Sequence, residues 1–179
     1  AYAVNESFGA GIQVFDLSNI DAGVVPNPTI VNTGGAEDSH NVAIDTESGF
    51  LYRCGGSEAA GGVRIYDLSN PAVPSYVGEW QDRSVHDLQV VTYTSGPNAG
   101  RQIAFLCSGF GNGGTETGFE IIDVTNKGNI QNLGRTVYPN GAYSHQVWLS
   151  EDRQYAYLND ELDENGAINT KTFVFDVSN

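Results

Sequence analysis

One stretch of this chain, Gly62-Val63-Arg64-Ile65-Tyr66-Asp67-Leu68-Ser69-Asn70, recurs with small changes along the whole sequence. The other copies occupy residues 11–19, 118–126 and 172–179. Their aspartates, Asp16, Asp67, Asp123 and Asp176, are separated by 51, 56 and 53 positions. A nearly constant period of this length indicates a repeat architecture.

Each copy is typical of a short β-strand followed by a turn. Branched and aromatic residues precede the aspartate, and the Asp-Leu-Ser-Asn ending offers side-chain oxygens that accept hydrogen bonds from nearby backbone amides. Three other strand-like segments accompany the repeat. They are histidine-opened segments at 40–44, 86–90 and 145–149, segments rich in small residues at 1–5, 50–55, 102–107 and 154–159, and less regular segments at 29–31, 75–78 and 130–134.

Four short antiparallel strands in about 50 residues are the pattern of one β-propeller blade. We therefore predict an all-β chain in which residues 1–179 form one arc of a propeller, with about 3.5 four-stranded blades. The expected blades are 1–35 (incomplete), 36–81, 82–138 and 139–179 (incomplete). Because a closed ring hides sheet edges, we expect missing blades or another chain to complete a larger ring.

The composition is strongly acidic, with 22 Asp and Glu residues against 8 Lys and Arg residues and a net charge of −14. Such a surface repels phosphate backbones, so we expect no nucleic-acid partner. No apolar run approaches the roughly 18 residues of a membrane span, so we expect no membrane insertion. The chain contains no methionine, and we interpret it as a mature or excised piece whose export signal and anchor lie outside it.

All three histidines, His40, His86 and His145, open the first strand of a predicted blade. First strands line the propeller axis, so the three imidazoles are expected to converge at one end of it. Converging imidazoles are typical ligands of Zn, Cu, Ni or Fe, and Asp87 is a further candidate as a ligand or as a residue that orients one. The alternative is structural, with the histidines bonded to the repeated aspartates and joining neighbouring blades.

An acidic run, Asp160-Glu161-Leu162-Asp163-Glu164-Asn165-Gly166, is a second candidate site. Carboxylate and amide oxygens are what Ca²⁺ prefers, so Asp160, Glu161 and Asp163 are candidate calcium ligands. The alternative is a solvated acidic loop without an ion. The two cysteines, Cys54 and Cys107, occupy equivalent positions in adjacent blades. We expect them to be buried free thiols, because such positions usually lie too far apart for a disulfide.

The repeat resembles that of LVIVD-repeat propellers. The segments 39–45, 85–90 and 143–152 and the acidic run at 158–164 resemble the choice-of-anchor B branch of that group. The resemblance implies a protein that is secreted or displayed at the cell surface.

We therefore expect an extracellular binding or scaffold module with a protein or polysaccharide partner. The alternative is a metal-dependent oxidase or hydrolase with a divalent metal on the axis. A third possibility is that the histidines serve only to join blades. The sequence defines no other cofactor.

Overall fold

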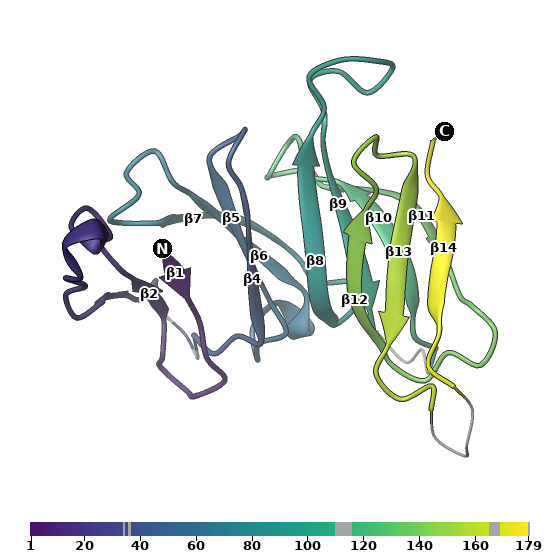
Figure 1. Ribbon diagram of the computed structural model, residues 1–179, viewed down its shortest axis with the longest axis horizontal. Helices are drawn as coiled ribbons and strands as arrows, with labels where there is room; N and C mark the ends of the chain where they lie inside the picture. Colours follow the sequence, from purple (N-terminus) through teal and green to yellow (C-terminus); the bar gives the residue numbers. More distant parts are fainter. Residues whose placement is uncertain (34, 36, 110–115, 165–168, 179) are drawn as a thin grey trace.

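The computed structural model describes residues 1–33, 35, 37–109, 116–164 and 169–178. Its strands form four separate antiparallel sheets of three, four, four and three strands, as the repeat predicts (Figure 1). The strands are β1 (Tyr2–Ala3), β2 (Ile12–Val14), β3 (Thr29–Val31), β4 (Asn41–Asp45), β5 (Phe50–Cys54), β6 (Val63–Asp67), β7 (Ser75–Trp80), β8 (Val85–Thr92), β9 (Gln102–Ser108), β10 (Gly118–Asp123), β11 (Gln131–Thr136), β12 (Ser144–Leu149), β13 (Tyr155–Asp160) and β14 (Thr172–Asp176). Two short 3-10 helices, η1 (Ile20–Ala22) and η2 (Ala59–Gly61), lie in connections.

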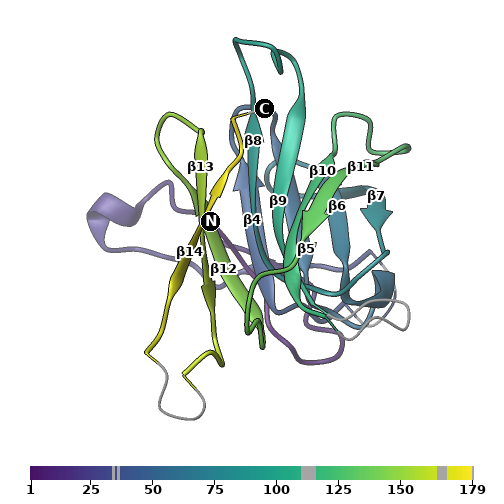
Figure 2. The same cartoon turned by 90° about the vertical axis from the view of Figure 1, so that its right-hand side faces the viewer.

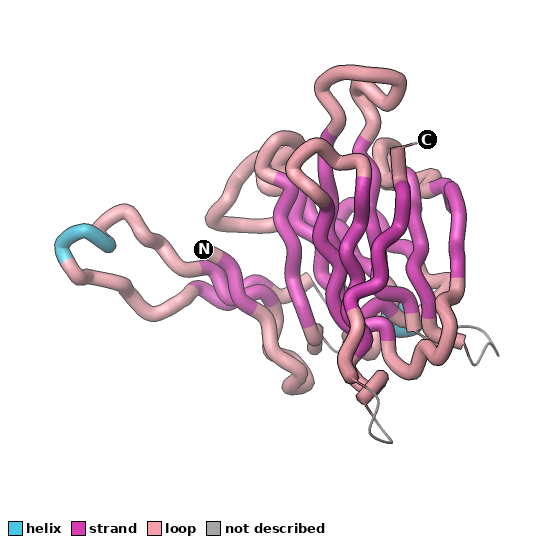
Figure 3. The backbone as a smooth tube through the Cα atoms, turned by 45° about the vertical axis from the view of Figure 1, so that its right-hand side comes forward, coloured by secondary structure: helices cyan, strands magenta, loops and turns pink. Residues whose placement is uncertain are grey.

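Each sheet is a simple meander of strands that follow one another in the chain, and we call the sheets blade 1 to blade 4. Strand β8 contacts both β4 and β12, so the first strands of blades 2, 3 and 4 lie side by side as the inner strands of an arc. Figure 2 shows the blades fanned around these inner strands, and Figure 3 shows how little of the backbone is helical. The all-β propeller arc predicted from the sequence is confirmed.

The core lies between blades and not inside any one of them. One cluster joins blades 2 and 3 and includes Tyr52, Ile65, Leu106 and Ile122. A second joins blades 3 and 4, where Phe105 packs with Leu158 and other apolar residues. Alternate residues of the middle strands of blades 2 and 3, such as β5 and β9, therefore bury against the preceding and the following blade, which is why these strands are apolar on both faces.

The glycine that opens the repeated stretch has a packing role. A β-carbon on Gly62 would lie 2.2 Å from the carbonyl oxygen of Trp80, and one on Gly118 would lie 2.6 Å from that of Thr136. Both carbonyls belong to the outer strand of the same blade. The equivalent residue of blade 4 is Lys171, where the described chain has no outer strand.

The repeated aspartates all close a turn in their own blade. Each accepts a hydrogen bond from the backbone amide two residues later, as the turn interpretation predicts. The pairs are Asp16 with Ser18, Asp67 with Ser69, Asp123 with Thr125 and Asp176 with Ser178. The amide of Ser69 lowers the pKa of Asp67, and the other three aspartates also have lowered pKa values. Cys54 and Cys107 are free and buried, as expected.

Candidate metal site at one end of the propeller axis

The three histidines lie at the same end of the inner strands. His40 immediately precedes β4, while His86 and His145 are the second residues of β8 and β12. Strands β8 and β12 both start at the lower end of the arc in Figure 1, where β13 ends. We call this the histidine end and the opposite end of the blades, where the repeated aspartates lie, the turn end.

The imidazole rings of the three histidines form a column that crosses three blades. The centroids of the His40 and His86 rings are 4.0 Å apart, and those of the His86 and His145 rings are 4.2 Å apart. The rings are tilted by 48° and 34°. The convergence expected from the repeat period is therefore present.

His86, in the middle of the column, is held in one tautomer. Its Nδ1 lies 2.9 Å from the carbonyl oxygen of His145, and a carbonyl only accepts, so Nδ1 carries the hydrogen. The Nε2 atom is left with a free lone pair, which is the form that binds metals. Burial lowers the pKa of His86, and the neighbouring His40 and His145 rings lower it further, although the bond to the His145 carbonyl opposes the shift. The neutral, metal-binding form is therefore favoured.

The carboxylate of Glu161 lies close to two of these rings. The candidate ligand atoms of His86, His145 and Glu161 all lie within 4.8 Å of one another. Glu161 Oε2 is 3.7 Å from His145 Nε2. Metal–ligand bonds of about 2.0–2.2 Å place tetrahedral ligand atoms about 3.3–3.6 Å apart, so a small side-chain adjustment brings the three donors onto one ion. The Glu161 side chain is 50% exposed, so the site opens to solvent.

The position of Glu161 depends on its neighbour Asp160. The Asp160 carboxylate accepts hydrogen bonds from the backbone amides of Ala142, Tyr143 and Leu162 and from the hydroxyl of Tyr138. Burial on its own would raise the pKa of Asp160, but these bonds outweigh it and lower the pKa. The Glu161 amide also donates to the carbonyl of Tyr143. These bonds fix the loop after β13 against the start of β12, and so hold Glu161 beside His145.

The other two residues singled out as metal ligands, His40 and Asp87, have different partners. His40 belongs to the column, but its Nδ1 lies 2.6 Å from Glu6 Oε1, so it pairs with another carboxylate. Asp87 accepts a hydrogen bond from the side chain of Asn41, and this bond joins blades 2 and 3. Among the residues that the structure describes, only His86, His145 and Glu161 form a group of three or more potential metal ligands.

The three candidate calcium ligands are not brought together. Asp160 is occupied by the amides described above, and Glu161 turns to His145. Asp163 is buried and accepts a hydrogen bond from the amide of Lys171. Asn165 and Gly166, at the end of the acidic run, lie outside the described residues.

The structural alternative assigned the repeated aspartates as partners of the histidines, and that assignment is wrong. The aspartates end the third strand of each blade, and the antiparallel pairing places that end away from the start of the first strand. In blade 2, for example, Asp67 pairs with Phe50, which pairs with Asp45 at the far end of β4. The histidine partners are instead Glu6, Glu161 and a backbone carbonyl.

The sequence did not single out Glu6, and it placed Glu161 only in the acidic run. A signal for Glu161 was present, because the end of one antiparallel strand lies beside the start of the preceding strand. In blade 4 that rule puts residues 160 and 161 near residue 145. No comparable signal exists for Glu6, which lies in an irregular segment of blade 1.

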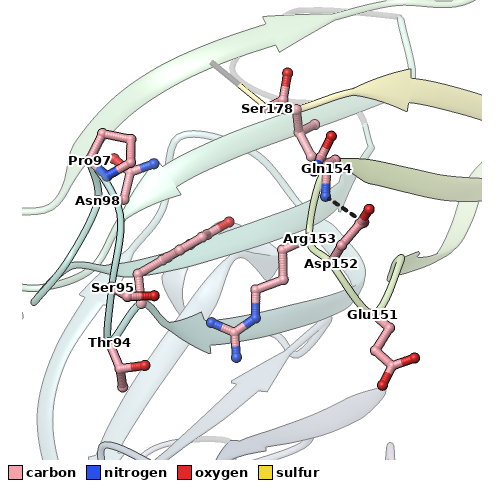
Figure 4. Close-up of a pocket in the computed structure, with 11 residues that line it drawn as sticks. Thr94, Ser95, Pro97, Asn98, Glu151, Asp152, Arg153, Gln154 and Ser178 are labelled. Atoms are coloured by element: carbon pink, nitrogen blue, oxygen red, sulfur yellow. Dashed lines mark hydrogen bonds between the residues drawn. The ribbon is translucent and has the colours of Figure 1, made fainter.

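A separate pocket lies at the turn end, between blades 3 and 4 (Figure 4). Arg153, in the β12–β13 turn, donates a hydrogen bond to the carbonyl of Thr92, and Asp152 accepts one from the amide of Gln154. The polar side chains of Thr94, Ser95 and Asn98 line the other side. The charged residues that line it are of both signs, Glu151, Asp152 and Arg153, and they are not among the potential metal ligands grouped in the described residues. The histidine end is therefore the stronger candidate for a functional site.

Comparisons with known proteins support the fold alone. The chain is similar to a protein from Lactobacillus plantarum (12% identity, TM-score 0.58), covering 98% of this chain and 52% of that one. It is also similar to hydrazine synthase of Kuenenia stuttgartiensis (11% identity, TM-score 0.57, covering 98% and 47%). A third similar structure is a putative 6-phosphogluconolactonase from Bacteroides fragilis (10% identity, TM-score 0.55, covering 93% and 48%).

No family model matches the chain, and no curated protein matches it. No helix among the described residues is long and apolar enough to cross a membrane. The chain spans about half the length of the propeller-like structures that it resembles. These comparisons identify an arc of a β-propeller.

Proposed function

We propose that this propeller arc binds a divalent transition-metal ion at the histidine end, through His86, His145 and Glu161. The observation that carries the proposal is the convergence of two imidazoles and one carboxylate within 4.8 Å, contributed by two blades. Two histidines and a carboxylate form the donor set of zinc hydrolases and of non-haem iron oxygenases. Three protein ligands leave a coordination position for water or a substrate, which supports a metal-dependent hydrolase or oxidase.

The hydrogen bonds that orient the three candidate ligands also support the proposal. The carbonyl of His145 fixes the tautomer of His86, and the amides around Asp160 fix the loop that carries Glu161. Such bonds behind metal ligands orient them and typically change metal affinity by about 10- to 100-fold when removed. The exposed side of the site, at Glu161, gives an ion and a small substrate access from solvent.

Titration with Co²⁺, followed by visible absorption, tests the site on the purified chain. We expect one ion per chain and a loss of binding in Glu161→Gln and His145→Ala. Glu164→Gln is the matched carboxylate control from the same loop, and it should bind normally. His40→Ala should also bind within a few-fold of the unmodified chain, because His40 pairs with Glu6. Failure of the unmodified chain to bind Co²⁺ or Zn²⁺ at micromolar concentrations would overturn the proposal.

A second candidate function is a binding or scaffold module without a metal, displayed outside the cell and directed at a protein or polysaccharide. It is favoured by the hydrogen bonds from His40 to Glu6 and from His86 to the His145 carbonyl, which join blades without an ion. The resemblance to choice-of-anchor B propellers and the acidic surface support an extracellular location. Under this function His86→Ala would lower the melting temperature of metal-free protein, and added Co²⁺ would leave it unchanged.

A further inference from the structure

The outward face of blade 4 exposes a row of large apolar side chains. Trp148, Tyr157 and Val174 are 62%, 41% and 57% exposed. The strand register places Trp148 opposite Tyr157 and Tyr157 opposite Val174, so the three lie side by side across β12, β13 and β14. Tyr155 is also exposed on β13, two residues from Tyr157. A contiguous apolar row of this kind marks an interaction surface.

The repeat shows what covers this face in an interior blade. By the repeat alignment, Tyr155 and Tyr157 hold the places of Ile103 and Phe105 in blade 3. Those two residues are 3% and 2% exposed because they are covered by blade 4. The partner that fits the open face of blade 4 is therefore another propeller blade.

The opposite end of the arc carries the complementary face. Ile12 of blade 1 packs on blade 2, so its neighbour Gln13 faces away from blade 2, in a row with Ala3 and Ile30. Ile30 is 48% exposed. Ala3 pairs with Gln13, three residues before Asp16, just as Leu158 pairs with Phe173, three residues before Asp176. Ala3 therefore holds the place of Leu158, which is fully buried against blade 3. The small residue leaves room for the aromatic side chains of a preceding blade.

The free edge of β14 is a poorer docking site than the face. Gly62 and Gly118 make room for the last carbonyl of the outer strand, and the equivalent residue in blade 4 is Lys171. An outer strand in the same register would meet the Lys171 β-carbon. A partner therefore packs on the face, in the way that one blade packs on the next.

We propose that two copies of this chain associate head to tail, the face of blade 4 in each copy packing on the outward face of blade 1 in the other. Two unlike faces on one chain make a heterologous contact, which closes into a ring when the rotation allows it. The arc covers 47–52% of the length of three propeller-like chains, so two arcs together match the length of one such chain. The two terminal sheets lie at opposite ends of the arc in Figure 1, as such closure requires.

Sedimentation velocity on the purified chain, from low to high micromolar concentration, tests this arrangement. We expect twice the monomer mass. Tyr157→Asp and Ile30→Asp should each raise the dimer dissociation constant at least 100-fold, whereas Leu133→Asp should not. Leu133 is the matched control, because it is exposed on β11 and lies outside both faces. Circular dichroism confirms that each variant is folded.

Mixing Tyr157→Asp with Ile30→Asp tests the head-to-tail geometry. One unmodified junction can form between the two variants, so the mixture should contain dimer that neither variant forms alone. An unmodified chain that stays monomeric at all concentrations would overturn the proposal. This is the result expected if blades of a longer chain cover the face. A dimer that survives Tyr157→Asp, or that Ile30→Asp leaves intact, would also overturn it. Co²⁺ binding by the monomeric variants would be unchanged, because each copy holds its own His86, His145 and Glu161.

Discussion

The two ends of the blades use repeated residues in different ways. At the turn end, each repeated aspartate bonds an amide two residues later and needs no other blade. At the histidine end, the repeated histidines contact one another across blades and recruit carboxylates that do not repeat. The comparison teaches that a local turn is reproduced by each copy of a repeat. A site is made only where copies are brought together.

The largest effect on folding should come from an aspartate at the histidine end. Asp160→Ala removes the shared acceptor of three amides and the Tyr138 hydroxyl, and should lower the free energy of unfolding by about 3 kcal/mol, because four hydrogen bonds to one carboxylate are lost and the buried Tyr138 hydroxyl is left unpaired. Urea denaturation measures it, with the exposed Asp152→Ala as the control from the same blade. The Asp160 contribution should be present above about pH 4 and be lost as pH falls through its lowered pKa. If Asp160→Ala lowered the free energy of unfolding no more than Asp152→Ala, aspartates at the histidine end would not be more important for stability than those at the turn end.

A second test concerns the glycine at the start of the repeated stretch. Gly62→Ala should lower the free energy of unfolding by about 2 kcal/mol, because the added methyl group meets the Trp80 carbonyl and the outer strand must shift. Lys171→Ala, at the equivalent position of blade 4, should change it by less than about 0.5 kcal/mol. Chemical denaturation of both variants gives the comparison. Equal losses would show that the outer-strand contact is not the reason for the glycine.

Lys127 tests whether the turn end is as local as its aspartates suggest. It follows the blade 3 turn, donates to the Val124 carbonyl, and lies 4.0 Å from the ring centroid of Phe50 in blade 2. Burial lowers its pKa to about 8, although Asp45 and Asp123 favour the charged form.

Between this pKa and the unfolded value of about 10.4, the unfolded chain binds more protons, so stability should rise with pH. Urea unfolding at about pH 7.5 and pH 9.5 should show the unmodified chain gaining stability relative to Lys127→Met. A relative loss over this range would contradict the buried, cross-blade position of the ammonium group.

The smallest effect should come from the repeated aspartates themselves. Asp67→Ala and Asp123→Ala should each lower the melting temperature by a few degrees at most. Asp67→Ala removes one surface turn, and Asp123→Ala removes one turn together with a partly exposed ion pair to Arg101. The double variant should show the sum of the two changes, since the turns lie in different blades and share no partner. Thermal unfolding of the three variants measures this. A clear departure from additivity would show that the turns are coupled across blades.

The fold was largely predictable because its signals are local. Each strand carries its own apolar pattern, and each turn carries its own aspartate. The repeat period then fixed the number of strands in every sheet, including the three-stranded sheets at both ends. The cysteines were also predictable, since equivalent points in adjacent blades are held apart by a whole interblade layer.

The candidate site was predictable only in part. The period brought His40, His86 and His145 to one end, but it assigned all three to the metal and gave no priority to Glu161. The choice among them depends on side-chain partners: Glu6 pairs with His40, and Asn41 binds Asp87. The amides around Asp160 turn Glu161 toward His145. Glu6 lies in an irregular segment, whose position no periodicity encodes, and the bond between Asn41 and Asp87 depends on how two blades pack.

The sequence by itself therefore determined the blades, their order and the end of the axis at which the histidines lie, because these follow from alternation and period. Only the tertiary structure decided which histidines share a carboxylate and that the repeated aspartates stay in their own turns. It also placed Trp148, Tyr157 and Val174 side by side on the outward face of blade 4. The physical reason is that hydrogen bonds and packing between blades act over a few ångströms, between residues that lie 34, 46 or 59 positions apart in the sequence.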